Sequence, residues 1–148
     1  MGFKITNMKY VPEQKYTGEI TPAQQKLIDV LNDTVEFYGE DPQGRRATNE
    51  NDQCMYLVRD TGNKCAVGRL LPEEGLNLIA SVFESALGYS VEPVCKKYLP
   101  EIPVRFLRHV QFLHDGKLYW DYNDKGLTGS GVEQYYIIFN NVVSGEYN

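Results

Sequence analysis

Residues 21–39 constrain the fold most, because they carry a complete set of helix signals. Thr21 and Gln24 stand at the capping-box spacing, and Pro22 suits the first turn of a helix. Apolar side chains then recur at helical intervals, at Leu27, Ile28, Leu31, Val35 and Tyr38. Gly39 is a typical residue at which a helix stops. The pattern predicts an amphipathic helix, which must bury its apolar face against other elements.

Four further helices are predicted from the same kinds of signal. They are expected at residues 72–87, 90–98, 103–114 and 130–144. The last of them begins with a second capping box, formed by Ser130 and Glu133. Residues 117–122 fit either a helix or a strand, and the sequence leaves that choice open.

Residues 54–59 and 64–71 are typical of the two strands of a β-hairpin, because a turn signature separates them. The turn contains Gly62, which tolerates a positive φ. Cys65 is expected to pair with Val58 or with Asp60, and both registers give its side chain the same facing. The expected fold class is therefore α+β, a single domain of about five helices packed around one hairpin.

The length of 148 residues suits one domain with a sizeable core. Residues 1–20 lack a helical period and are expected to form an extended arm. Residues 39–53 are almost wholly polar and are expected to form a surface loop. Arg45 and Arg46 are the only cations of this loop, so they are either solvated or, if the loop folds over a ligand, placed to bind an anionic group.

The formal net charge of −5 disfavours a nucleic-acid-binding protein, which needs a basic face for phosphates. No apolar run approaches the roughly 20 residues that span a bilayer, and the first residues lack the apolar core of a secretory signal. The three cysteines are odd in number and sparse, as is typical of reduced thiols. We therefore expect a cytoplasmic protein that binds proteins or small molecules. Its aromatic surplus is compatible with a homo-oligomer.

Cys65 and His114 are the residues from which nucleophilic chemistry could be built. His114 follows Gln111 by three residues on one side of a predicted helix, and Asp115 is adjacent. A thiol, an imidazole and a carboxylate or amide would supply the nucleophile, base and orienting group of a hydrolase or transferase. The plainer interpretation is structural, because a single cysteine in an apolar strand is usually a small buried hydrophobe.

Zinc is a weaker hypothesis, because a structural zinc site needs four ligands that usually come as two close pairs. Neither Cys-x₂-Cys nor His-x₃-His occurs, so Cys54, Cys65, Cys95 and His114 could converge only through the tertiary fold. In the predicted hairpin, Cys54 lies about four residues along the ladder from Cys65, which is too far for a disulfide. We expect no metal and no cofactor.

One longer pattern begins with Cys54, Tyr56, Gly62 and Lys64, and continues as Cys-Ala-Val-Gly-x-Leu-Leu-Pro from Cys65 to Pro72. It ends downstream in Gln111, His114 and Asp115. This pattern resembles that of small uncharacterised proteins encoded by bacteriophages and prophages, and it covers about half of the chain. Val110 stands where those proteins have leucine.

The resemblance implies a phage origin, and small acidic phage accessory proteins commonly block a host factor or sequester a signalling nucleotide in antiviral defence. We therefore expect a non-enzymatic accessory protein, with anti-defence as one form of its role, that binds a host protein or a nucleotide-like small ligand. The residues expected at the binding surface are Tyr56, Lys64, Cys65, Arg69, Gln111, His114, Arg45 and Arg46. The alternative is a cysteine-dependent hydrolase or transferase that uses Cys65, His114 and Asp115. Cys65 is expected to face the fourth predicted helix.

Overall fold

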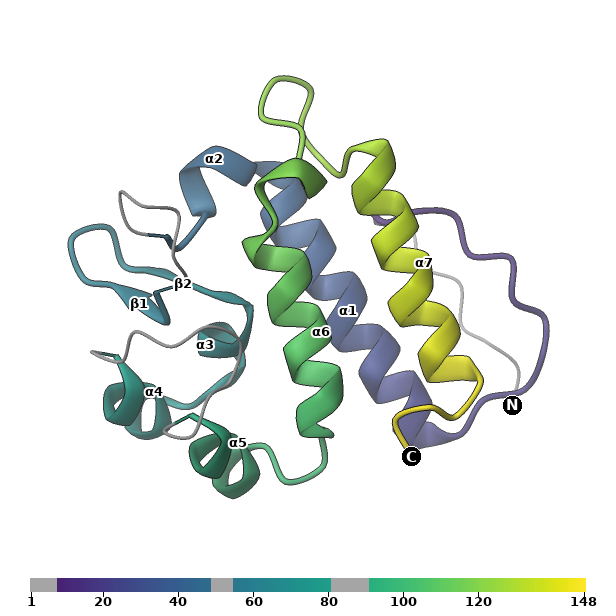
Figure 1. The fold of residues 1–148 in the computed structure, drawn as a ribbon, viewed down its shortest axis with the longest axis horizontal. Coiled ribbons are helices and arrows are strands. Elements are labelled where there is room, and N and C mark those ends of the chain that lie inside the picture. Colours follow the sequence, from purple (N-terminus) through teal and green to yellow (C-terminus); the bar gives the residue numbers. More distant parts are fainter. Residues whose placement is uncertain (1–7, 49–54, 81–90) are drawn as a thin grey trace. The chain divides into compact units, whose positions relative to one another are not determined.

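Figure 1 shows the computed structural model, which describes residues 8–48, 55–80 and 91–148. Seven α-helices and one two-stranded antiparallel sheet lie within these residues, so the fold is α+β as predicted. The elements are α1 (Pro22–Glu40), α2 (Pro42–Arg45), β1 (Leu57–Val58), β2 (Asn63–Lys64), α3 (Ala66–Leu70), α4 (Glu73–Ile79), α5 (Glu92–Tyr98), α6 (Val104–Asp115), the 3₁₀ helix η1 (Lys117–Tyr119) and α7 (Gly129–Val143).

The chain divides into two compact units. The first consists of Met1–Pro42 together with Leu118–Asn148, and the second is Gln43–Lys117. Whether the two behave as one domain, as the length of the chain suggests, stays a prediction. None of the helices within the described residues has both the length and the apolar character that a membrane span needs.

In the first unit, α1 packs against α7 (Figure 1). The capping box predicted for α1 is confirmed: Thr21 Oγ1 accepts a hydrogen bond from Gln24 N at 3.1 Å, and Gln24 Oε1 accepts one from Thr21 N at 2.8 Å. The predicted apolar face is buried in full. The buried side chains of this unit's core are Leu27, Ile28, Leu31, Val35, Tyr38, Trp120, Tyr135, Ile138, Phe139, Val142 and Tyr147.

The capping box predicted at the start of α7 is wrong by two residues. Thr128 caps this helix, and its Oγ1 accepts a hydrogen bond from Gly131 N at 3.2 Å. Thr128 is fixed at this position by the preceding segment: its N–H donates to the backbone oxygen of Tyr119 at 2.9 Å and its hydroxyl donates to that of Leu118 at 2.6 Å. The residues that the sequence left open form η1, after which Trp120 pairs with Leu127 in an isolated antiparallel bridge.

In the second unit the hairpin is much shorter than predicted. Leu57 pairs with Lys64 and Val58 pairs with Asn63, across a turn in which Gly62 has a φ of +77°. Both predicted pairings of Cys65 are therefore wrong. The observed register differs from them by an even number of residues, so each side chain still faces the predicted side of the hairpin. The predicted strand over residues 64–71 is also wrong beyond Lys64, because its remainder forms the helix α3.

The other helices of the second unit follow the sequence pattern more closely. Pro72 precedes α4, Pro103 precedes α6, and α3 packs against α6. Residues 81–87 of the helix predicted at 72–87, and the first residue of the helix predicted at 90–98, lie outside the described residues; α5 begins after Val91.

The short helices α2 and α3 raise the number of helices above the predicted five. The first of them lies in the segment predicted to be a polar loop, where Pro42 supplies the fixed φ that a first helical turn requires.

Candidate functional site

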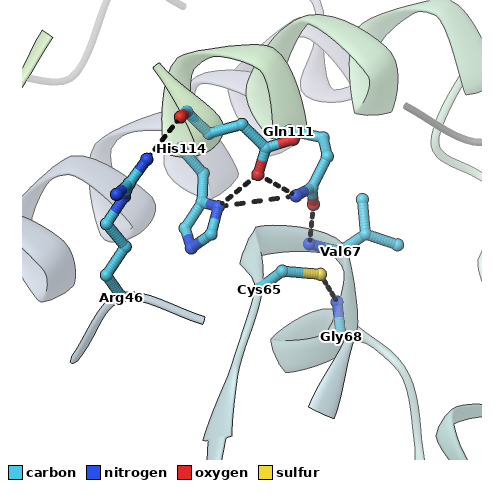
Figure 2. A network of polar contacts seen from close by, with 7 residues as sticks. Arg46, Cys65, Val67, Gly68, Gln111 and His114 are labelled. Carbon is cyan, nitrogen blue, oxygen red and sulfur yellow. Dashed lines mark hydrogen bonds and ion pairs between the residues drawn. The ribbon is translucent and has the colours of Figure 1, made fainter. Parts of the chain in front are cut away.

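The structure brings several of the predicted site residues together where the N-terminus of α3 meets α6 (Figure 2). Cys65 precedes α3, while Gln111, His114 and Asp115 occupy the last turns of α6. Arg46, which follows α2, reaches the same end of α6. We call Arg46, Gln111, His114 and Asp115 the α6 polar cluster.

Two side chains cap the N-terminus of α3. Cys65 Sγ accepts a hydrogen bond from the backbone N–H of Gly68 at 3.3 Å, and Gln111 Oε1 accepts one from the backbone N–H of Val67 at 3.1 Å. The first amides of any helix lack partners within the helix, and a helix of one or two turns is unstable alone. Cys65 and Gln111 therefore stabilise α3, and Gln111 also joins it to α6.

Within the α6 polar cluster, Asp115 contacts both Gln111 and His114. The carboxylate Oδ1 of Asp115 accepts a hydrogen bond from Gln111 Nε2 at 2.8 Å and lies 2.8 Å from His114 Nδ1. Because a carboxylate only accepts hydrogen bonds, this contact requires the proton of His114 on Nδ1. Arg46 Nη2 donates to the backbone oxygen of Asp115 at 2.8 Å, which caps the C-terminus of α6.

Burial separates this arrangement from an open catalytic site. Cys65 and Gln111 are 0% exposed and His114 is 1% exposed. A reactive thiol must be accessible and is activated by a base or a positive environment. Here the sulfur of Cys65 accepts a hydrogen bond from a backbone amide, and Nδ1 of His114 faces Asp115. The three residues of the hydrolase hypothesis thus lie at the same helix junction, but the thiol caps α3 and the imidazole faces Asp115 within α6.

The other predicted binding residues lie in different environments. Lys64 is exposed in β2, as predicted. Arg69 in α3 and Arg45 in α2 are half-buried. Tyr56 is fully buried, and its backbone oxygen accepts a hydrogen bond from Cys65 N at 3.3 Å. Of the predicted set, Lys64 is therefore the residue best placed to meet a partner.

The two cysteines that the structure describes belong to no metal-binding group. Cys65 and Cys95 are free and buried, and no group of three metal-binding side chains occurs in the part of the chain that the structure describes. Cys54 lies outside the described residues. Burial, followed by the neighbouring Cys65 and Glu92, raises the pKa of the Cys95 thiol to about 12. A thiol in this state is a poor nucleophile and a poor metal ligand at neutral pH.

Sequence reasoning missed the capping function of this site. Its acceptors are a cysteine sulfur and a glutamine from another helix, whereas helix caps are usually serine, threonine, aspartate or asparagine. The signal available in the sequence was the grouping of Cys65, Gln111 and His114 into one pattern, which correctly indicated that two distant segments meet.

A comparison of the chain with protein-family models, curated proteins and solved structures gave no match. The resemblance to phage-encoded proteins therefore stays a prediction that rests on the residues quoted for it.

We expect both buried thiols to resist alkylation in the folded protein. Burial raises the pKa of Cys95 to about 12, so its reaction with iodoacetamide should accelerate only as the pH approaches that value. In urea the same thiol should titrate near an ordinary pKa of about 8.5. Mass spectrometry of the peptides that contain Cys65 and Cys95 measures both rates. Faster alkylation of Cys65 in the folded protein than in urea would contradict its assignment as a cap and would favour the enzyme hypothesis.

Proposed function

We propose that this protein is a non-enzymatic accessory protein of the phage type, and that it acts by binding a host protein. Anti-defence is one form that this role can take. The observation that carries the proposal is the use of the motif residues Cys65 and Gln111 as caps of α3. Because these acceptors stabilise the fold, the presence of Cys65 and Gln111 in the motif needs no catalytic explanation. The exposed motif residue Lys64 is instead available for binding.

A protein partner fits the second unit better than a nucleotide-like ligand does. Small-ligand sites need polar groups that converge on an open concave surface. The polar groups that converge here are buried: Gln111 bonds Val67 and Asp115, and Nδ1 of His114 faces Asp115. On the outer side of α6, Phe112 is 52% exposed, and aromatic side chains are enriched at protein–protein interfaces.

The proposal predicts that the protein retains a host protein from a bacterial lysate, and that exposed Lys64 contributes to the contact. Immobilised wild-type protein, Lys64→Glu and Lys97→Glu are incubated with the same lysate, and bound proteins and small molecules are identified by mass spectrometry. The wild type should retain a defined protein, and Lys64→Glu should retain much less of it. Lys97 is also exposed, in α5, so Lys97→Glu makes the same charge change away from the hairpin and should leave retention unchanged.

Three outcomes would count against the proposal. One is the retention of nothing by any of the three proteins. Another is equal loss of the retained protein in both variants, which would indicate nonspecific charge attraction. The last is recovery of a nucleotide-like molecule in place of a protein. All three proteins should be folded by circular dichroism, and Lys97→Glu should melt slightly lower, because it removes a cation 5.2 Å from the Tyr98 ring and from the last turn of α5.

A further inference from the structure

The first unit holds its own residues 8–20 along α1 and α7, with bends at residues 9–11 and 18 and no helical turn between them (Figure 1). The carboxylate of Glu36 in α1 accepts two hydrogen bonds from this segment, from Lys9 N at 3.0 Å and from Tyr10 N at 2.6 Å. Both donors are backbone amides. Glu36 therefore recognises the course of a peptide chain rather than a particular side chain.

The ring of Tyr10 rests on two glycines. A Cβ at Gly39 would lie 2.7 Å from Cβ of Tyr10, and one at Gly126 would lie 3.1 Å from Cδ1 of Tyr10. Gly39 lies inside α1 and its φ is not positive, so its backbone does not require glycine. The missing side chain at Gly39 instead leaves room for an aromatic ring.

The tyrosines of α7 bind the middle of the segment. The hydroxyl of Tyr136 donates to the backbone oxygen of Glu13, and the side-chain amide of Gln14 donates to the hydroxyl of Tyr135. Tyr135 in turn donates to Oδ1 of Asn32 in α1 at 2.7 Å. Further along, the ring of Tyr16 meets Phe139 edge-on with ring centroids 6.4 Å apart.

These contacts follow a general mode of peptide recognition. In that mode, backbone hydrogen bonds hold the peptide on a sheet edge and alternate side chains enter the surface; here side chains of α1 and α7 take the place of the edge. Along residues 13–20 exposure alternates: Glu13, Lys15, Thr17 and Glu19 are exposed and the residues between them are half-buried. Three of the hydrogen bonds use backbone groups of the segment, so a different sequence with an aromatic residue in the place of Tyr10 could form them too.

The segment is also an imperfect occupant of this face. Oε1 of Gln14 is buried and has no hydrogen-bond partner among the described residues. An acceptor left buried without a partner costs free energy. A peptide that places another residue at this position would avoid that cost.

We propose that the face formed by α1 and α7 is a binding site for an extended peptide segment of a partner protein, and that residues 8–20 occupy it as an internal competitor. The partner segment carries an aromatic residue that fits over Gly39 and Gly126, with its amide and the preceding amide on Glu36. This inference concerns the first unit and goes beyond the proposed function, and either can fail without the other.

The test uses the full chain with its own segment loosened. Tyr10→Ala removes the ring from the segment but leaves Glu36, Tyr135 and Tyr136 in place. A fluorescent peptide with the sequence of residues 8–20 is titrated with each protein and its anisotropy is measured. Because the tethered segment competes at a high effective concentration, Tyr10→Ala should bind the peptide at least about tenfold more tightly than the wild type does.

Controls assign the binding to this face. In the Tyr10→Ala background, Glu36→Gln should weaken peptide binding, because a neutral amide accepts backbone hydrogen bonds less strongly than a carboxylate does. Asp29→Asn makes the matched change elsewhere on α1, where Asp29 accepts a hydrogen bond from Gln25 at 2.8 Å, and should leave peptide binding unchanged. A peptide with alanine in place of Tyr10 should bind more weakly to the same protein.

The proposal is overturned if folded Tyr10→Ala does not bind the peptide, or if Glu36→Gln and Asp29→Asn act alike. Dimerisation of Tyr10→Ala without peptide binding also overturns it, since the face would then serve a second copy of this chain. If circular dichroism shows that Tyr10→Ala does not fold, Gln14→Ala replaces it, because this variant loosens the segment by removing the hydrogen bond to Tyr135. The same results then support or overturn the proposal.

Discussion

Replacing Gly68 by alanine is expected to lower the free energy of unfolding by about 2 kcal/mol, the middle of the range for overpacking a close contact. Gly68 occupies the first turn of α3, and a Cβ there would lie 2.4 Å from the backbone oxygen of Tyr56. A backbone oxygen cannot rotate away as a side chain can, so α3 or the segment before β1 must shift. Valine should cost more than alanine, because it adds two methyl groups at the same point.

Gly129→Ala provides the matched control. Gly129 also lies in the first turn of a helix, yet a Cβ there would meet nothing within 4 Å. The gain in helix propensity on replacing glycine by alanine is similar at both sites, so the difference between the variants reports the contact with Tyr56. Urea denaturation of both variants measures it. Equal stability of the two would show that α3 does not pack closely on Tyr56.

The helices with complete local signals could be predicted from the sequence. In α1 the capping residues, the proline and the apolar face all lie within one segment, so no distant contact was needed to find it. The start of α7 was misplaced because Thr128 and Ser130 are both acceptable caps. The hydrogen bonds of Thr128 to the backbone of Leu118 and Tyr119, which the local sequence does not announce, favour Thr128.

Residues 65–71 could not be predicted in the same way. A short run that is apolar on both sides fits a buried strand and a buried helix equally well. The helix is favoured here by Gln111, which caps Val67 from 44 residues further along the chain. The other capping residue, Cys65, is not one of the usual N-cap residues, so the local sequence gives no signal for the start of α3.

The candidate site was predicted in part, because the pattern grouped Cys65 with Gln111 and His114 and the structure brings α3 onto α6. What those residues do there depends on burial, which the spacing of residues does not reveal. A thiol, an imidazole and a carboxylate at an open surface would favour nucleophilic chemistry. Here the thiol and the imidazole are buried, the thiol caps α3, and Gln111 makes the bond between the two helices.

The helix junction itself predicts the second large effect. Gln111→Ala should lower the free energy of unfolding by about 3 kcal/mol, because truncation leaves a buried amide without its acceptor. The Val67 N–H loses the oxygen that lies 3.1 Å away, and Asp115 loses the donor at 2.8 Å. Gln25→Ala is the matched control, since that side chain bonds Asp29 at an exposed position and its truncation should cost little.

Hydrogen exchange locates the loss caused by Gln111→Ala. If Gln111 acts by capping α3, the amides of Val67 and Gly68 should lose protection before those in the middle of α6, because α3 is too short to persist without its caps. Uniform loss of protection across the second unit would mean that Gln111 serves the whole core rather than this junction. If Gln111→Ala is as stable as Gln25→Ala, the bond to Val67 contributes little to the free energy of unfolding. The capping of α3 would then not explain why Cys65 and Gln111 occur together in the sequence pattern.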